Sequence, residues 1–218
     1  MLQFIIFAPL LGSILSGFFS QRFSEKVTIN FTTILIFLSS FFSWVTFFTS
    51  DYYNVREIIL FKWIESGSLV VNWEIRLDSL TTIMLVVITT ISAFVHLYSI
   101  GYMSNDPNWE KSEKYKPRFF SFLSLFTFAM LMLVTSNNFV QLFFGWEGVG
   151  LASYLLIGFY YKKSTANIAA IKAFIVNRIG DIGLALAIFS TFYYVGSLNF
   201  NDLFLMAPEI SNKSINIL

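Results

Sequence analysis

The chain alternates long apolar stretches with short polar segments, and six of the apolar stretches are long enough to cross a membrane. A transmembrane helix needs about 20 predominantly apolar residues, because it must pass through a hydrocarbon layer about 30 Å thick. The stretches that meet this requirement cover residues 2–20, 29–49, 79–102, 118–135, 138–161 and 166–195. The pattern therefore predicts about six transmembrane helices.

The segment between the second and third stretches has a different period. Apolar and polar residues alternate over 71–78, which is typical of a strand with one buried face. Another apolar run at 58–64 precedes it, and the polar residues 65–68 lie between the two. We therefore predict a short β-hairpin on the outer face of the membrane.

These elements define an all-α membrane protein with about six transmembrane helices and a short outer β-hairpin between helices 2 and 3. Its expected parts are 1–50 with the first two helices, 51–78 with the outer loop and hairpin, 79–196 with helices 3 to 6, and 197–218 as an outer-side tail.

Composition supports a membrane protein and excludes several chemistries. The chain is 56% hydrophobic and 12% charged, whereas soluble domains usually carry about 25% charged residues. It has no cysteine, which excludes disulfides, iron–sulfur clusters and thiolate zinc sites, and its one histidine, His96, excludes a bis-histidine haem within the chain. We expect no cofactor on this chain. A net charge of +1 gives no attraction to nucleic acid, so membrane lipids are the expected surroundings.

The basic residues predict the orientation of the helices. One side of the predicted membrane carries Arg22, Lys26, Lys111, Lys114, Lys116, Arg118, Lys162 and Lys163. The other side carries Arg56, Lys62, Arg76 and Lys213 in longer segments, together with Asp51, Glu57, Glu65, Glu74 and Asp78. Because lysine and arginine are enriched in short cytoplasmic loops, the first group should face the cytoplasm or matrix. Both termini then lie on the outer side.

Four charged residues fall inside the predicted helices: Glu147 in the fifth, and Lys172, Arg178 and Asp181 in the sixth. An ionisable side chain at mid-membrane costs about 2.5–3.5 kcal/mol on insertion scales, so such residues usually pair, line water or carry protons. We interpret Glu147 as a group that binds and releases protons. A glutamate that is satisfied by a structural partner is the alternative.

The other intramembrane polar residues have less certain assignments. Arg178 and Asp181 are three residues apart and share a helix face, and a guanidinium that keeps its proton would tune Asp181 and Glu147. Asp181 is interpreted as a relay or coupling group, with a simple salt bridge as the alternative. Lys172 points elsewhere, either as a relay or as a side chain that extends to the inner surface. His96 suits proton passage, although a single histidine among aromatic residues is more often a packing residue.

Four strings of residues together suggest a family. They are GWEGVGLASYLL at 145–156, AAIKAFIVNRIGD at 169–181, RLDSL at 76–80 and HLYSIGYM at 96–103. These strings resemble NADH dehydrogenase subunit 5, the antiporter-like subunit of respiratory complex I, and the resemblance covers residues 1 to about 196. The large subunit of Mrp-type sodium/proton antiporters shares a looser version of the string around Glu147.

The resemblance implies a proton-translocating subunit in the membrane arm of NADH:quinone oxidoreductase. In that family a glutamate of the fifth helix pairs with a lysine of a seventh helix, and Glu147 matches the glutamate. Arg178 and Asp181 match the polar pair of the family's sixth helix. The chain would then belong to an enzyme, a proton-translocating NADH:ubiquinone reductase, without carrying redox chemistry itself. The implied location is the mitochondrial inner membrane, or alternatively a bacterial inner membrane.

Length leaves the function open. Members of the family are much longer, and their paired lysine would lie beyond residue 218. The expected partners are other membrane-arm subunits of complex I and, if the subunit is split, a chain that supplies the rest of it. Three functions are therefore considered: the N-terminal part of a proton pump that works through Glu147, part of an Mrp-type sodium/proton antiporter subunit, or a structural membrane module that translocates nothing.

Overall fold

The computed structural model describes the chain except for residues 51–53, 68, 105, 111–112 and 213–218. Lys111 and Lys213 of the orientation argument, Asp51 of the outer loop and the end of the predicted tail lie outside the described residues. The elements are α1 (Leu2–Phe18), α2 (Glu25–Thr49), β1 (Arg56–Ser66), β2 (Leu69–Leu77), α3 (Ser79–Tyr102), α4 (Tyr115–Val134), α5 (Phe139–Ile157), α6 (Ser164–Val195) and α7 (Phe200–Asn212).

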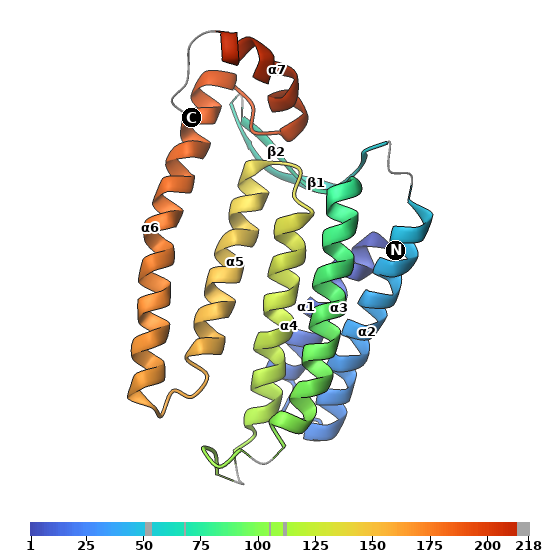
Figure 1. Cartoon of the computed structure of the whole chain (residues 1–218), viewed down its shortest axis with the longest axis vertical. Helices are drawn as coiled ribbons and strands as arrows, with labels where there is room; N and C mark the ends of the chain where they lie inside the picture. The colour runs from blue at the N-terminus through green and yellow to red at the C-terminus, as the bar shows by residue number, and fades with distance from the viewer. Residues whose placement is uncertain (51–53, 68, 105, 111–112, 213–218) are drawn as a thin grey trace.

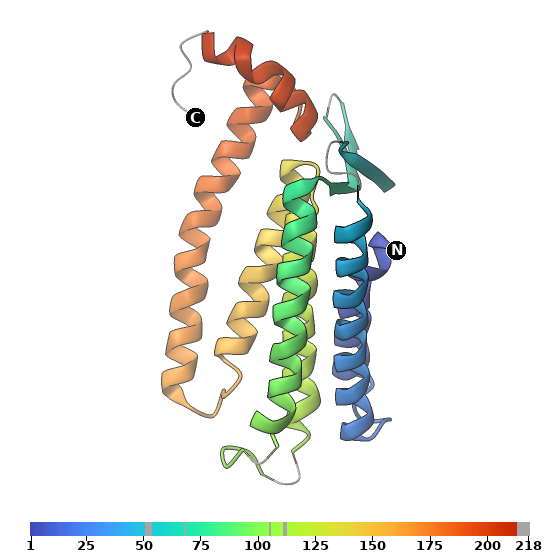
Figure 2. The same ribbon diagram turned by 45° about the vertical axis from the view of Figure 1, so that its right-hand side comes forward.

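The helices α1 to α6 run alternately up and down. The N-terminus, the hairpin and α7 therefore lie toward one end of the molecule, and the loops that precede α2, α4 and α6 lie at the other (Figure 1). Helices α1 to α4 form a bundle, α5 packs against α4, and α6 packs against α5 at the edge of the structure (Figure 2).

The predicted fold class is confirmed. Five helices, α2 to α6, are long and apolar enough to cross a membrane, and α1 is an apolar helix of 17 residues, at the lower limit of spanning length. Two helix ends, those of α2 and α5, differ from the prediction by four residues. Helix α2 begins at Glu25 rather than at residue 29 because the Ser24 hydroxyl accepts a hydrogen bond from the Val27 N–H. Helix α5 ends at Ile157 rather than at 161. Just beyond its end, Phe159 packs against Trp109.

The predicted hairpin is present and somewhat longer than expected. Strands β1 and β2 pair antiparallel, with Glu57 opposite Arg76 and Ile58 opposite Ile75. Gly67 has a φ of 59° in the connecting turn, a conformation that glycine adopts without steric cost. Val71, Ile75 and Leu77 are buried, as the alternating pattern of 71–78 predicted for the apolar face of this strand.

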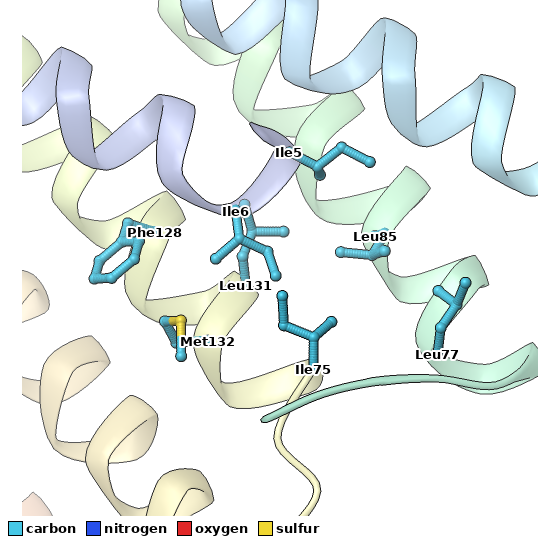
Figure 3. Packing of buried hydrophobic residues seen from close by; sticks show 8 residues of the cluster. All are labelled: Ile5, Ile6, Ile75, Leu77, Leu85, Phe128, Leu131 and Met132. Carbon is cyan, nitrogen blue, oxygen red and sulfur yellow. The ribbon is translucent and has the colours of Figure 1, made fainter. Parts of the chain in front are cut away.

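The main apolar core joins the hairpin to the helices. Ile75 of β2 and Leu77 at its end lie in one cluster with Ile6 of α1, Leu85 of α3 and Leu131 of α4 (Figure 3). Ile5, Phe128 and Met132 complete the buried part of this cluster. The hairpin is thus a structural part of the bundle, and it fixes the ends of three helices that lie nearest to it relative to one another.

Asp78 is the N-cap residue of α3. Its carboxylate accepts the Thr81 N–H at 2.8 Å and the Arg76 Nε–H at 3.0 Å. Burial alone would raise the pKa of Asp78, but the hydrogen bonds from Thr81 and Arg76 outweigh it and hold that pKa below its usual value. This cap fixes where the chain turns from the hairpin into the membrane.

Glu74 and Arg76 are buried, whereas the alternating pattern of 71–78 predicted that the polar face of this strand would be exposed. Their assignment to the outer side stays a prediction. Glu74 is only 3% exposed, and Arg76 is 9% exposed. Asn137 lies between them: its Nδ2 donates to Glu74 at 2.5 Å, and its Oδ1 accepts from Arg76 at 3.0 Å. Arg76 also donates to Asn201 at 2.8 Å. Burial is tolerated because the charges compensate each other and are hydrogen-bonded.

The predicted tail at 197–218 contains a helix, α7, that was not expected from the sequence. It is too short and too polar to resemble a membrane span. Its start is anchored to the turn between α4 and α5, where the Phe200 N–H donates to the Asn137 carbonyl and the Phe139 N–H donates to the Leu198 carbonyl. The start of α5 is therefore held by the hairpin on one side and by α7 on the other.

Helices α4 and α5 approach each other most closely at Gly145. A Cβ added there would lie 2.6 Å from the backbone nitrogen and Cα of Leu133, so any side chain would collide with the α4 backbone. Gly145 precedes Glu147 by two residues, and the close contact therefore sets the depth and rotation of the segment that carries Glu147.

We expect Gly145→Ala to reduce the free energy of unfolding by about 1–3 kcal/mol, the usual cost of overpacking, because the α4 backbone cannot move aside as a side chain can. Gly101→Ala is the matched control, since a Cβ at Gly101 of α3 meets nothing within 4 Å. The measurement is the melting temperature of both variants in the same detergent. Equal melting temperatures would show that the α4–α5 contact is loose.

Candidate functional site

The three predicted groups Glu147, Arg178 and Asp181 meet between α5 and α6. Arg178 Nη1 donates to Glu147 Oε2 at 2.5 Å, and the same Nη1 lies 3.5 Å from Asp181 Oδ2. The Arg178–Asp181 contact is the one that their three-residue spacing predicted. One guanidinium therefore serves two carboxylates that come from different helices.

Asp181 has a second partner that the sequence analysis did not identify. The indole N–H of Trp146 donates to Asp181 Oδ1 at 2.8 Å. Trp146 precedes Glu147 on α5, so α5 contacts α6 through two adjacent residues. An indole N–H usually finds an acceptor when it is withdrawn from water, and this general tendency was the available signal. Asp181 is one of the few buried residues of α6.

A cleft of about 320 Å³ opens at this ion cluster. Its wall includes Glu147 and Gly150 of α5 and Asn177, Arg178 and Asp181 of α6. Met130 and Leu133 of α4 form the other side of the cleft. The Arg178 guanidinium lies over the Phe174 ring, 4.8 Å from its centroid, which holds the cation without an additional hydrogen bond.

The charges in this cluster do not balance. With both carboxylates ionised, two negative charges and one guanidinium leave one negative charge uncompensated within the cluster. Glu147 Oε1 is buried and has no hydrogen-bond partner among the described residues, whereas Oε2 is bound to Arg178. The free oxygen is an acceptor for a proton, a water molecule or a further cation. The site can therefore hold or exchange one positive charge.

The other two predicted residues lie apart from this cluster. Lys172 is exposed on α6 and makes no ion pair with any residue that the structure describes. His96 is fully buried between α3 and α4, where Nδ1 contacts the Ser92 carbonyl at 2.8 Å and Nε2 contacts the Ser124 hydroxyl at 3.0 Å. Both imidazole nitrogens thus have partners outside the α5–α6 contact. This geometry matches the packing alternative for His96.

Within the described residues, no three side chains of His, Cys, Asp or Glu come together as metal ligands would. The side chains of the α5–α6 cluster are suited to ionic chemistry. The cluster consists of two acids, one permanent cation, one indole donor and a cleft through which a proton or cation can reach them.

Two family descriptions match the sequence. "NADH-Ubiquinone oxidoreductase (complex I), chain 5 N-terminus" matches residues 63–120, and "NADH:quinone oxidoreductase/Mrp antiporter, TM" matches residues 136–218. The second match includes the complete ion cluster, and the first includes the hairpin strand β2, α3 and the start of α4.

Full-length relatives extend the similarity across the whole chain. The NADH-quinone oxidoreductase subunit L of Rhodobacter capsulatus is 56% identical over 100% of this chain and 30% of its own length. The NADH-ubiquinone oxidoreductase chain 5 of Chondrus crispus is 48% identical over 98% of this chain and 31% of its own length. The chain therefore spans about a third of the length of these relatives.

A solved structure has a similar fold at low sequence identity. It is the membrane-bound sulfane sulfur reductase, an archaeal respiratory membrane complex, in which one chain matches with a TM-score of 0.75 and 16% identity. The match covers 96% of this chain and 40% of that chain, and it concerns the fold alone.

The fold, the ion cluster and these matches define an antiporter-like membrane subunit of the kind found in respiratory complexes. The chain belongs to the complex I chain 5 family, also named NADH-quinone oxidoreductase subunit L, and corresponds to its N-terminal part. The family suggested by the sequence strings is thereby confirmed.

We expect the Trp146–Asp181 hydrogen bond to stabilise the α5–α6 contact more than a neutral bond does. Trp146→Phe should lower the free energy of unfolding by roughly 1–2 kcal/mol, because its acceptor is a carboxylate. Trp44→Phe is the control: the Trp44 indole donates to the neutral Thr90 hydroxyl at 3.1 Å, and such interhelical bonds average about 0.6 kcal/mol. Melting temperatures in one detergent would test this, and an equal or smaller loss for Trp146→Phe would contradict it.

Proposed function

We propose that the chain forms the N-terminal part of a proton-translocating subunit of NADH:quinone oxidoreductase, in which Glu147 binds and releases the proton. The observation that carries this proposal is the shared guanidinium: Arg178 contacts Glu147 and Asp181 at once, and one carboxylate oxygen of Glu147 has no partner within the described chain. The proposal is supported by the names of two relatives, which are a subunit of an NADH-quinone oxidoreductase and a chain of an NADH-ubiquinone oxidoreductase.

The proposed mechanism moves charge by exchanging partners. A proton or a cationic side chain that arrives at the free oxygen of Glu147 would neutralise the excess negative charge of the cluster. If Arg178 then shifts its contact toward Asp181, Glu147 loses its cation and a proton on it is retained. If Arg178 returns, the carboxylate is stabilised and the proton is released. The 3.5 Å contact between Arg178 and Asp181 makes this exchange a short movement.

The energy required is modest. Moving one charge against a potential of about 100 mV costs about 2.3 kcal/mol. That amount corresponds to a change of roughly fifty-fold in proton affinity. Gaining or losing one close ion pair in a low-dielectric cleft is an interaction of at least this size. The redox reaction that supplies the energy is assigned to other chains of the complex, and we propose the inner membrane of mitochondria or bacteria as its location.

A sodium/proton antiporter is the second candidate, because one of the two matching family descriptions also names Mrp antiporters. The same ion cluster would then exchange a proton for a sodium ion. The named relatives at 56% and 48% identity are subunits of NADH oxidoreductases, which favours the first candidate. A structural module without transport is the third candidate, and it assigns no role to the uncompensated charge of the cluster.

We expect Glu147→Gln to lower the number of protons translocated per NADH oxidised, because an amide cannot take up and release the proton. The variant should be built in the full-length subunit within its assembled complex, and pumping should be measured in sealed vesicles alongside NADH oxidation with an artificial acceptor. Glu65→Gln is the matched control, since Glu65 is an exposed glutamate of the hairpin.

Three results decide between the candidates. Reduced pumping with normal assembly supports the proposal, and unchanged proton stoichiometry in Glu147→Gln refutes it. If transport in the unmodified protein requires sodium and continues without NADH, the antiporter is correct instead.

A further inference from the structure

Trp146 and Glu147 are neighbours on α5, and both side chains reach α6. The Trp146 indole N–H donates to Asp181 Oδ1 at 2.8 Å, and Glu147 Oε2 accepts from Arg178 Nη1 at 2.5 Å. Arg178 and Asp181 are in turn joined by a contact of 3.5 Å between Nη1 and Oδ2. The four side chains therefore form a closed ring of contacts between α5 and α6, in which Trp146 is the one member without a charge.

The two oxygens of the Asp181 carboxylate have different partners. Oδ1 accepts the indole N–H at a normal hydrogen-bond length, whereas Oδ2 lies 3.5 Å from Arg178, beyond the usual range of about 2.7–3.2 Å for N–H···O bonds. Arg178 makes its short bond to Glu147 instead. The indole thus supplies Asp181 with a hydrogen bond, and the guanidinium is left to Glu147.

Burial gives this division its importance. Asp181 is 7% exposed, so its carboxylate is withdrawn from solvent and needs donors from the protein. Within the described part of the chain its donors are Trp146 and, at the longer distance, Arg178. The Trp146 residue is itself 46% exposed, so packing of its ring alone does not account for its orientation. If the indole N–H were absent, Arg178 would be the remaining donor for both acids.

The indole can hold Asp181 without neutralising it. An indole N–H is a donor without charge, so the cluster keeps its excess negative charge while the position of the Asp181 carboxylate is fixed. The donor is also carried by a well-supported segment, because Trp146 follows Gly145, where the α5 backbone rests on Leu133 of α4. Trp146 is therefore placed to orient Asp181 and to preserve the charge that attracts a proton.

We propose that Trp146 is a positioning residue for the proton step at Glu147: its indole N–H holds Asp181 and thereby leaves the Arg178 guanidinium to Glu147. This inference rests on the function proposed above. Without the indole N–H, Asp181 would draw Arg178 toward itself, because a buried charged acceptor that lacks a donor is costly. Glu147 would then be without its cation and would retain its proton instead of releasing it. Trp146 acts through Asp181 and takes no part in the proton transfer itself.

The test separates the N–H of Trp146 from its ring. Trp146→Phe keeps a ring and removes the N–H, whereas Trp146→Gln keeps a neutral N–H donor and removes the ring. Both are made in the full-length subunit within its assembled complex, and the number of protons translocated per NADH oxidised is measured in sealed vesicles. We expect Trp146→Phe to lower this ratio about as far as Glu147→Gln does, since losing a hydrogen bond to a charged acceptor shifts a two-state balance roughly tenfold. Trp146→Gln should keep a higher ratio than Trp146→Phe.

Trp44→Phe is the matched control, because the Trp44 indole donates to the neutral Thr90 hydroxyl outside the ion cluster. This variant should leave the ratio unchanged. Assembly is checked by the presence of the subunit in the purified complex. If Trp146→Phe does not assemble, benzothienylalanine at position 146 carries the test, since it keeps the shape of the two fused rings and lacks the N–H.

Each outcome supports or refutes the proposal. A lower ratio in Trp146→Phe than in Trp146→Gln, with an unchanged ratio in Trp44→Phe, supports it. A normal ratio in Trp146→Phe refutes it, and so does an equal loss in Trp44→Phe. A ratio in Trp146→Gln as low as that in Trp146→Phe assigns the role to ring packing and also refutes it. A reduced ratio in Glu147→Gln with a normal one in Trp146→Phe refutes this inference alone, whereas a normal ratio in Glu147→Gln refutes the function on which it rests.

Discussion

The ionic contact of Arg178 with Glu147 and Asp181 is the interaction on which the proposed function depends. In hydrocarbon a charge has no water to stabilise it, so each charged side chain of a membrane span needs a partner from the protein. Here one guanidinium is divided between two acids on different helices. With both acids ionised, the division leaves the cluster one positive charge short, which is the property that the proposed proton site requires.

The remainder of the fold keeps α5 in position for this contact. The buried pair Glu74 and Arg76 holds the turn before α5 through Asn137. The missing side chain of Gly145 lets the α5 backbone rest directly on α4. Both constraints act on the helix that carries Glu147, whereas α6 contacts mainly α5. Within the described residues, α5, which carries Glu147, is therefore held more firmly than α6, which carries Arg178 and Asp181.

Much of the architecture was predictable from the sequence because hydrocarbon imposes strong rules on a chain. The length of apolar runs indicated the spans, the period of two at 71–78 indicated the hairpin, and the i, i+3 spacing placed Arg178 beside Asp181. Other features depend on contacts between distant segments. Nothing near Arg76 in the sequence indicates that Asn137 and Asn201 will enclose it. Helix α7 was missed because a short polar helix has no hydropathy signal, and the Trp146–Asp181 bond was missed because it joins residues 35 positions apart.

The unequal support of α5 and α6 has a mechanical consequence. When one helix of a packed pair is held by many contacts and the other by few, an applied force displaces the helix that is held by few. Within the described part of the chain, a force along the membrane would therefore move α6 past α5 more readily than α5 past α4. Such a slip would carry Arg178 and Asp181 together across a stationary Glu147, which would turn a displacement of a helix directly into a change of electrical surroundings.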